Sequence, residues 1–138
     1  MKEFSPKWKK SKSKRKHRKY LAKAHLKLRH KMMSVNLSKE LRKQFGRRSI
    51  EPRKGDVVRI MRGEFKKKEG KIVRLDFKKY KIYIEGVQKT KKDGTKVNVP
   101  IHPSNLQIKE LNLEDAKRLQ NAHKKINHSQ DMASSKKS

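Results

Sequence analysis

The chain has 138 residues, of which 42 are lysine or arginine and 13 are aspartate or glutamate, so its formal net charge is +29. This excess is typical of a protein that binds a polyanion, either nucleic acid or an anionic membrane, because neutralised phosphates release their counterions. Hydrophobic residues make up 31% of the chain, which excludes a packed core along its whole length. We therefore expect part of the chain to be ordered by its partner or not at all.

The absence of cysteine excludes disulfides and cysteine-based zinc sites. No apolar run approaches the roughly 20 residues of a membrane span. The Lys-rich start has no apolar signal-peptide core, so we expect a soluble, non-secreted protein. The basic run 7–19 also suits a nuclear import signal, although a solvated or RNA-bound tail explains it equally well.

The charge is concentrated at the N-terminal end. Residues 1–50 carry a net charge of +17, residues 51–110 one of +9 and residues 111–138 one of +3. We predict a basic N-terminal arm with short helices over 1–50, a folded domain over 51–110, and a C-terminal helix followed by a disordered tail over 111–138.

Two helices are predicted within the arm. The apolar residues of the first follow helical spacing and lie at Leu21, Ala24, Leu28 and Met32. Those of the second recur every four positions, at Leu37, Leu41 and Phe45. Gly46 is a natural C-cap, and Asn36 or Ser38 is the N-cap. The second helix is expected to pack on the following domain, with binding to a partner as the alternative.

The middle of the chain has the period-two alternation of β-strands. Strands are predicted over 56–61, 71–75, 81–85, 88–90, 97–99 and 106–108, with Asp93-Gly94 as a two-residue hairpin turn. About five short strands in this length favour a mainly β fold, a small barrel. The predicted core comprises Val58, Ile60, Ile72, Val73, Leu75, Ile82, Ile84, Val99 and Leu106. Beyond it, a weak apolar stripe predicts a helix from Leu113 to about Ile126.

The most informative motif runs from Lys54 to Val73. It predicts two strands joined by a basic loop, in which glycines allow unusual backbone conformations and close approaches. Considered alone, it could be an ordinary charged hairpin. It resembles the KOW motif of ribosomal proteins and transcription elongation factors, through its glycines Gly55, Gly63 and Gly70 and through Asp56, Val58, Lys66, Lys71 and Ile72. The pattern departs at Lys67, where many family members have glycine.

The wider sequence resembles one ribosomal family. Residues 33–42, 48–50 and 101–105 are similar to the eukaryotic and archaeal large-subunit proteins counted as the twenty-sixth, equivalent to the bacterial twenty-fourth. The resemblance covers about residues 20–115. It implies an SH3-like KOW barrel with basic extensions, a structural role in the large subunit and in its assembly, and a place near the nascent-chain exit. The implied location is the cytoplasmic ribosome, after nucleolar passage.

The implied partners are large-subunit ribosomal RNA and neighbouring ribosomal proteins, with no membrane, small-molecule substrate, cofactor or metal. We expect the loop lysines to meet phosphates and the arm to thread between RNA helices. Trp8, Tyr20 and Phe65 are candidates for stacking on bases, although Phe65 could equally be core. The predicted RNA-binding residues are Lys7, Lys9, Lys10, Lys12, Lys14, Arg15, Lys16, Arg18, Lys19, Arg29, Lys31, Arg47, Arg48, Arg53, Lys54, Arg59, Arg62, Lys66, Lys67, Lys68 and Lys71.

Other functions have less support in the sequence. The six histidines lack zinc-ligand spacing, and His102 is expected to have a structural role in a turn because no triad partner is evident. No isolated acidic pair or P-loop sequence is present, so we predict no enzyme activity. A KOW-bearing transcription or RNA-processing factor and a basic membrane-surface protein stay open as alternatives.

Overall fold

The computed structural model describes residues 11–114 and Arg118. The helices, including one 3-10 turn (η1), are α1 (Lys14–Lys23), α2 (Leu26–Met32), α3 (Lys39–Phe45) and η1 (Pro103–Asn105). The strands are β1 (Val35–Leu37), β2 (Ser49–Ile50), β3 (Val57–Ile60), β4 (Glu69–Asp76), β5 (Lys81–Ile84), β6 (Gln88–Thr90), β7 (Lys96–Asn98) and β8 (Leu106–Glu110).

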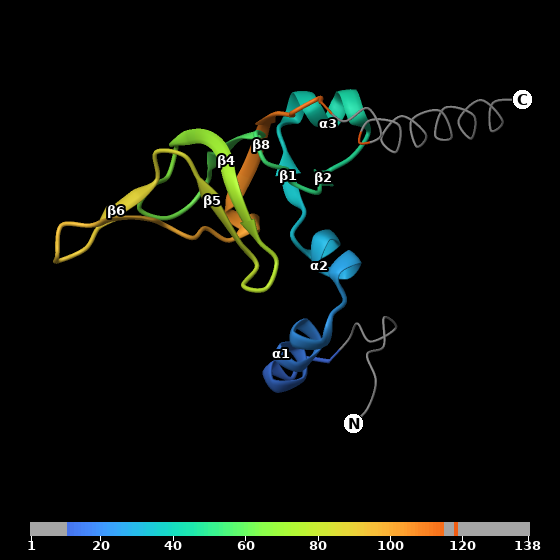
Figure 1. Ribbon diagram of the computed structural model, residues 1–138. Coiled ribbons are helices and arrows are strands. Elements are labelled where there is room, and N and C mark those ends of the chain that lie inside the picture. The colour runs from blue at the N-terminus through green and yellow to red at the C-terminus, as the bar shows by residue number, and fades with distance from the viewer. Residues whose placement is uncertain (1–10, 115–117, 119–138) are drawn as a thin grey trace, which may run out of the picture.

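Six strands form one sheet in the order β2-β1-β8-β3-β4-β5, and β6 pairs with β7 as a separate hairpin. The pairings within the sheet are antiparallel except for β1 with β8, which is parallel. A bridge between Ile82 and Ile101 brings β5 against the segment that precedes η1. The fold is therefore mainly β and barrel-like, as predicted, with α1 and α2 leading away from the sheet (Figure 1).

The core prediction is confirmed for six residues and wrong for Val73. Buried as predicted are Val58, Ile60, Ile72, Ile82, Ile84 and Leu106. Leu75 and Val99 are partly buried against this core, whereas the Val73 side chain is 50% exposed. The pairing of β4 with β5 shifts register between Ile72 and Arg74. This bulge inserts one residue, so that Ile72 and Leu75 both face inward while Val73 turns to solvent.

The N-terminal segment completes the core in a way that the sequence did not predict. Met33, Val35 and Leu37 are fully buried. Leu37 lies in β1, which pairs with β8, a strand far along the chain, and does not belong to the second helix. That helix is α3, which begins after the N-cap Ser38, whose side chain accepts a hydrogen bond from the Leu41 amide. As predicted, Gly46 ends it in the left-handed conformation, with φ of 56°, and Leu41 packs on the core.

The first predicted helix is two helices, because the chain turns at Ala24 and His25. The His25 side chain accepts from the Leu28 amide and caps α2. Arg29 then reaches back to α1, donating from Nε to the Ala24 carbonyl at 2.7 Å and from a terminal nitrogen to the Ala22 carbonyl at 2.9 Å. These bonds satisfy carbonyls at the end of α1 that have no partner within the helix.

The β6–β7 hairpin projects from the sheet (Figure 1), and its predicted two-residue turn is wrong. The Lys91 amide donates to the Thr95 carbonyl and the Gly94 amide to the Lys91 carbonyl. The loop therefore has three residues. Of its members only Gly94 has positive φ, at 87°, which is the usual pattern of a type I turn followed by a bulge.

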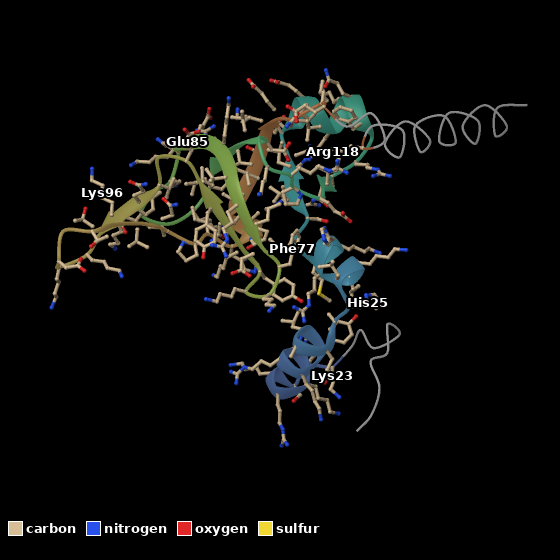
Figure 2. The ribbon with its side chains drawn as sticks, in the orientation of Figure 1. Lys23, His25, Phe77, Glu85, Lys96 and Arg118 are labelled. Carbon is tan, nitrogen blue, oxygen red and sulfur yellow. The ribbon has the colours of Figure 1, made fainter. Side chains whose placement is uncertain are left out.

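Past the domain, Leu113 and Glu114 are not helical, and the rest of the predicted C-terminal helix and tail lies outside the described residues apart from Arg118. The side chain of Arg118, labelled in Figure 2, is buried against that of Asp56, which is fully inaccessible. Two guanidinium nitrogens donate to the two carboxylate oxygens, each at 2.7 Å. The Arg53 and Asn112 amides donate to the same carboxylate. This network ties Arg118 to the start of the KOW motif.

Candidate nucleic-acid interface

Helix α1 presents the densest positive charge among the described residues. Its ten residues include no acidic side chain and none that is buried. Exposed on or just before it are Lys12, Lys14, Arg15, Lys16, Arg18 and Lys19. Lys7, Lys9, Lys10 and Trp8, predicted for the same arm, lie outside the described residues. The basic side chains spread over more than half of the helix circumference and leave His17, Tyr20 and Leu21 on the remaining face, a distribution that suits contact with several phosphates.

The β3–β4 loop carries three exposed lysines in succession, Lys66, Lys67 and Lys68. Lys67 has a left-handed backbone, with φ of 72°. Its amide donates to the Ile60 carbonyl at 2.8 Å, and the Ile60 amide donates to the Lys68 carbonyl at 2.9 Å. Two residues thus oppose one, which is a bulge whose first position favours glycine. The departure from the KOW pattern at Lys67 leaves this left-handed conformation in place and adds a cation to the loop tip.

Replacing Lys67 with glycine should raise the free energy of unfolding by about 0.5–1 kcal/mol, because glycine tolerates this φ without steric cost. Lys66→Gly removes the same charge at a position without positive φ. This substitution should lower the free energy of unfolding by about 0.5–1 kcal/mol, because glycine loses more backbone entropy on folding. Urea denaturation of both variants measures the difference. Equal destabilisation by the two substitutions would contradict the bulge.

Each of the three motif glycines occupies a position where a side chain would be unfavourable. A side-chain carbon at Gly70 would lie 2.7 Å from the Glu85 carbonyl oxygen, and one at Gly55 would lie 2.8 Å from the Asn112 side chain. Gly63 has φ of 95°, a backbone conformation that favours glycine.

Phe65, in the same loop, packs against the core, and the Lys68 ammonium lies 5.2 Å from its ring centroid. This arrangement favours the interpretation of Phe65 as a core residue over stacking on a base.

The outer face of β3 and β4 holds further predicted residues. Val57 pairs with Lys71, and Arg59 with Glu69. The Arg59 guanidinium lies 3.7 Å from the Glu69 carboxylate, with both side chains partly exposed. This pair adds little stability, since exposed ion pairs contribute about 0–1 kcal/mol. Also exposed are Lys54, Arg62 and Lys71.

A basic cleft of about 590 Å³ lies where the loops around α3 meet β2. Sequence reasoning predicted four of its basic residues but not that they would meet. Its lining also includes two hydroxyl groups, one carboxylate and the buried Arg118. The residues are Lys31, Ser34, Gly46, Arg47, Arg48, Ser49, Ile50, Glu51, Arg53 and Arg118. Arg29, by contrast, is engaged at the end of α1.

His102 has the structural role that was predicted. Its Nδ1 accepts from the Ser104 amide at 3.3 Å and lies 2.8 Å from the Ser104 hydroxyl, so it caps η1. Burial lowers the pKa of His102, and the charge of Lys81 lowers it further. The folded protein therefore binds protons at His102 less readily than the unfolded chain does.

Stability should consequently fall as the pH drops below about 6.5, where the unfolded chain takes up the proton first. His102→Asn keeps an oxygen acceptor for the cap and removes the titrating group. We expect the variant to lose less stability than the parent between pH 7 and pH 5, as followed by thermal unfolding. Identical pH profiles would contradict a perturbed His102.

Within residues 11–114 and at Arg118, no three histidine or acidic side chains gather as a metal site would require. The same residues contain no helix with the length and apolarity needed to cross a membrane. The described side chains offer a basic helix, a basic loop and a basic cleft on a small β domain, which is the arrangement expected of a nucleic-acid-binding module.

Comparison with known proteins narrows the class of nucleic-acid-binding modules to one family. A family model that describes the ribosomal proteins called L26 in eukaryotes and their archaeal L24 counterparts matches residues 11–125. The large ribosomal subunit protein uL24 of the archaeon Methanosphaera stadtmanae is 47% identical over 116 residues, which span 84% of this chain and 99% of the relative. The chain belongs to this L26 family of ribosomal proteins, and it is therefore not an enzyme.

Proposed function

We propose that this protein is a structural constituent of the large ribosomal subunit that binds ribosomal RNA through α1, the β3–β4 loop and the basic cleft. The observation that carries the proposal is the match to a ribosomal family along residues 11–125, in a chain with a net charge of +29. Most of the binding free energy would come from phosphate contacts and counterion release. Recognition would follow the shape of folded RNA more than its sequence.

The roles proposed for the three parts of the chain differ. Of the predicted arm over 1–50, the part that ends with α2 threads between RNA helices and neutralises their phosphates. Strands β1 and β2 belong to the sheet, so residues 33–50 join residues 51–110 in the domain that presents the loop lysines to the RNA surface, and residues 111–138 follow this domain. Neighbouring ribosomal proteins are the other proposed partners of this chain. A position near the nascent-chain exit and passage through the nucleolus during assembly rest on the family resemblance. Photo-crosslinking to a stalled nascent chain tests the exit position.

Sedimentation of a cell lysate through a sucrose gradient, before and after a high-salt wash, tests the ribosomal assignment. We expect the protein to comigrate with the large subunit and to stay there after the wash. Release by salt, or a peak among light or polymerase-containing fractions, would favour the alternative of a KOW-bearing factor that acts off the ribosome.

A further inference from the structure

A second cavity, of about 620 Å³, lies between α1, α2 and the β4–β5 turn, and sequence reasoning did not predict it. Its volume falls within the roughly 300–1,000 Å³ of typical ligand pockets. Two phenol rings and two aliphatic side chains supply apolar surface, while two lysines and two histidines add polar groups. The lining residues are His17, Tyr20, Leu21, Met32, Lys79, Tyr80, Lys81 and His102.

Contacts between the β4–β5 turn and the helices hold the walls of this cavity in place. The Tyr80 hydroxyl donates to the Leu21 carbonyl at 3.2 Å. The rings of His30 and Phe77 stack with their centroids 4.0 Å apart and an angle of 27° between them, and Figure 2 shows Phe77 beside α2. The cavity walls are thus braced by contacts within the protein itself.

The turn also positions Tyr80 at some conformational cost. The Asp76 carboxylate accepts from the Lys78 and Lys79 amides, both at 3.0 Å, and Tyr80 follows with φ of 54°. A bulky residue rarely adopts this conformation. Burial raises the pKa of Tyr80, the Arg29 charge lowers it, and the nearby Tyr20 phenol raises it again. Both phenols line the cavity, and the phenol of Tyr80 is partly desolvated there.

The combination of surfaces restricts what could bind there. Aromatic and aliphatic walls suit a flat apolar ring, and lysines at such walls suit an attached anion. His102 adds a donor, since its Nδ1 accepts from the Ser104 amide and the neutral ring must then carry its proton on Nε2. A nucleotide has both the flat ring and the attached anion, because every base offers a stacking face and is linked to a phosphate.

We propose that this cavity binds one unstacked base of RNA, with a neighbouring phosphate against Lys79 and Lys81. The inference rests on the proposed RNA-binding function and deepens it: the α1 helix, the β3–β4 loop and the basic cleft contact backbone phosphates, whereas this cavity requires an unpaired nucleotide. The protein would thereby favour RNA with a bulged or looped base over a continuous duplex.

Variants of the full chain test the inference by filter binding to two probes, a mixed-sequence single-stranded RNA and a fully paired RNA hairpin. Tyr20→Ala should weaken single-strand binding at least fivefold and change duplex binding less than twofold, because it removes a stacking face. Tyr83→Ala is the matched control: this ring lies outside the cavity, with the Arg74 guanidinium 5.7 Å from its centroid, and should change neither.

A second pair of variants distinguishes a phosphate contact in the cavity from the effect of overall charge. Lys79 lines the cavity and the adjacent Lys78 does not. Lys79→Ala should therefore weaken single-strand binding more than Lys78→Ala does, although both remove one charge from one turn. Equal losses within each matched pair, with the parent protein still bound to both probes, would overturn the cavity inference alone. Failure of the parent protein to bind either probe would overturn the proposed function as well.

Crosslinking in intact ribosomes tests the inference without a variant, so it stays informative if Tyr20→Ala perturbs the structure of α1. After 4-thiouridine incorporation and irradiation, peptides that contain Tyr20 or Tyr80 should carry a nucleotide that is unpaired in the ribosomal RNA. Attachment to a base-paired nucleotide, the finding of another protein's side chain in the cavity by chemical crosslinking, or the absence of any adduct on these peptides would each overturn the inference.

Discussion

Replacing Asp56 with alanine should lower the free energy of unfolding by about 3–5 kcal/mol, the usual cost of removing one partner of a buried ion pair. The carboxylate is fully buried and accepts four hydrogen bonds, two from the Arg118 guanidinium and two from the Arg53 and Asn112 amides. Its loss would leave both amides without this acceptor and the buried guanidinium without a counter-charge, bonded only to the Asn112 and Glu51 carbonyls. Urea denaturation at moderate salt measures the change.

Two further variants make this prediction specific. Glu64→Ala removes a carboxylate from an exposed pair with Lys89, which has an N–O distance of 3.0 Å, and should cost less than about 1 kcal/mol. Adding Arg118→Met to Asp56→Ala should recover part of the lost stability, because no charge is then left buried. If Asp56→Ala cost no more than Glu64→Ala, the buried network would not contribute to the folded state.

Local patterns in the sequence predicted much of the sheet but not its N-terminal edge. Alternation along 57–60 and 81–84 corresponds to strands with every second side chain buried. Strand β1 has only three residues and β2 only two. Strand β1 is stabilised by pairing with β8, which is distant in the sequence, and β2 by pairing with β1, so the residues of these short strands carry little period-two pattern of their own. The apolar spacing from Leu37 to Phe45 instead favoured a longer helix.

The interface shows the same division between local and distant information. The β3–β4 loop lies within one motif, and its lysines and glycines were predicted together. The basic cleft and the aromatic cavity each bring side chains from several separate segments into one place. Composition predicts that basic residues meet an anion, but it does not indicate which of them share a surface. Arg29 illustrates the limit, since its guanidinium binds carbonyls of α1.

Changing Lys66, Lys67 and Lys68 together to alanine should flatten the salt dependence of RNA binding. Each lysine that contacts a phosphate contributes about one unit to the slope of log affinity against log salt concentration, so the slope should fall by up to about three. All three side chains are exposed at the loop tip, and alanine at Lys67 meets the same backbone conformation as lysine does. Filter binding to large-subunit ribosomal RNA over a range of salt concentrations measures the slope.

The β6–β7 hairpin offers a control of equal charge. Lys91, Lys92 and Lys96 are also exposed and lie outside the predicted RNA-binding set, so replacing all three with alanine should leave the slope nearly unchanged. A loss of affinity that is the same for both triple variants would mean that binding follows net charge alone. An unchanged slope for the β3–β4 variant would remove that loop from the interface, leaving α1 and the basic cleft to supply the phosphate contacts.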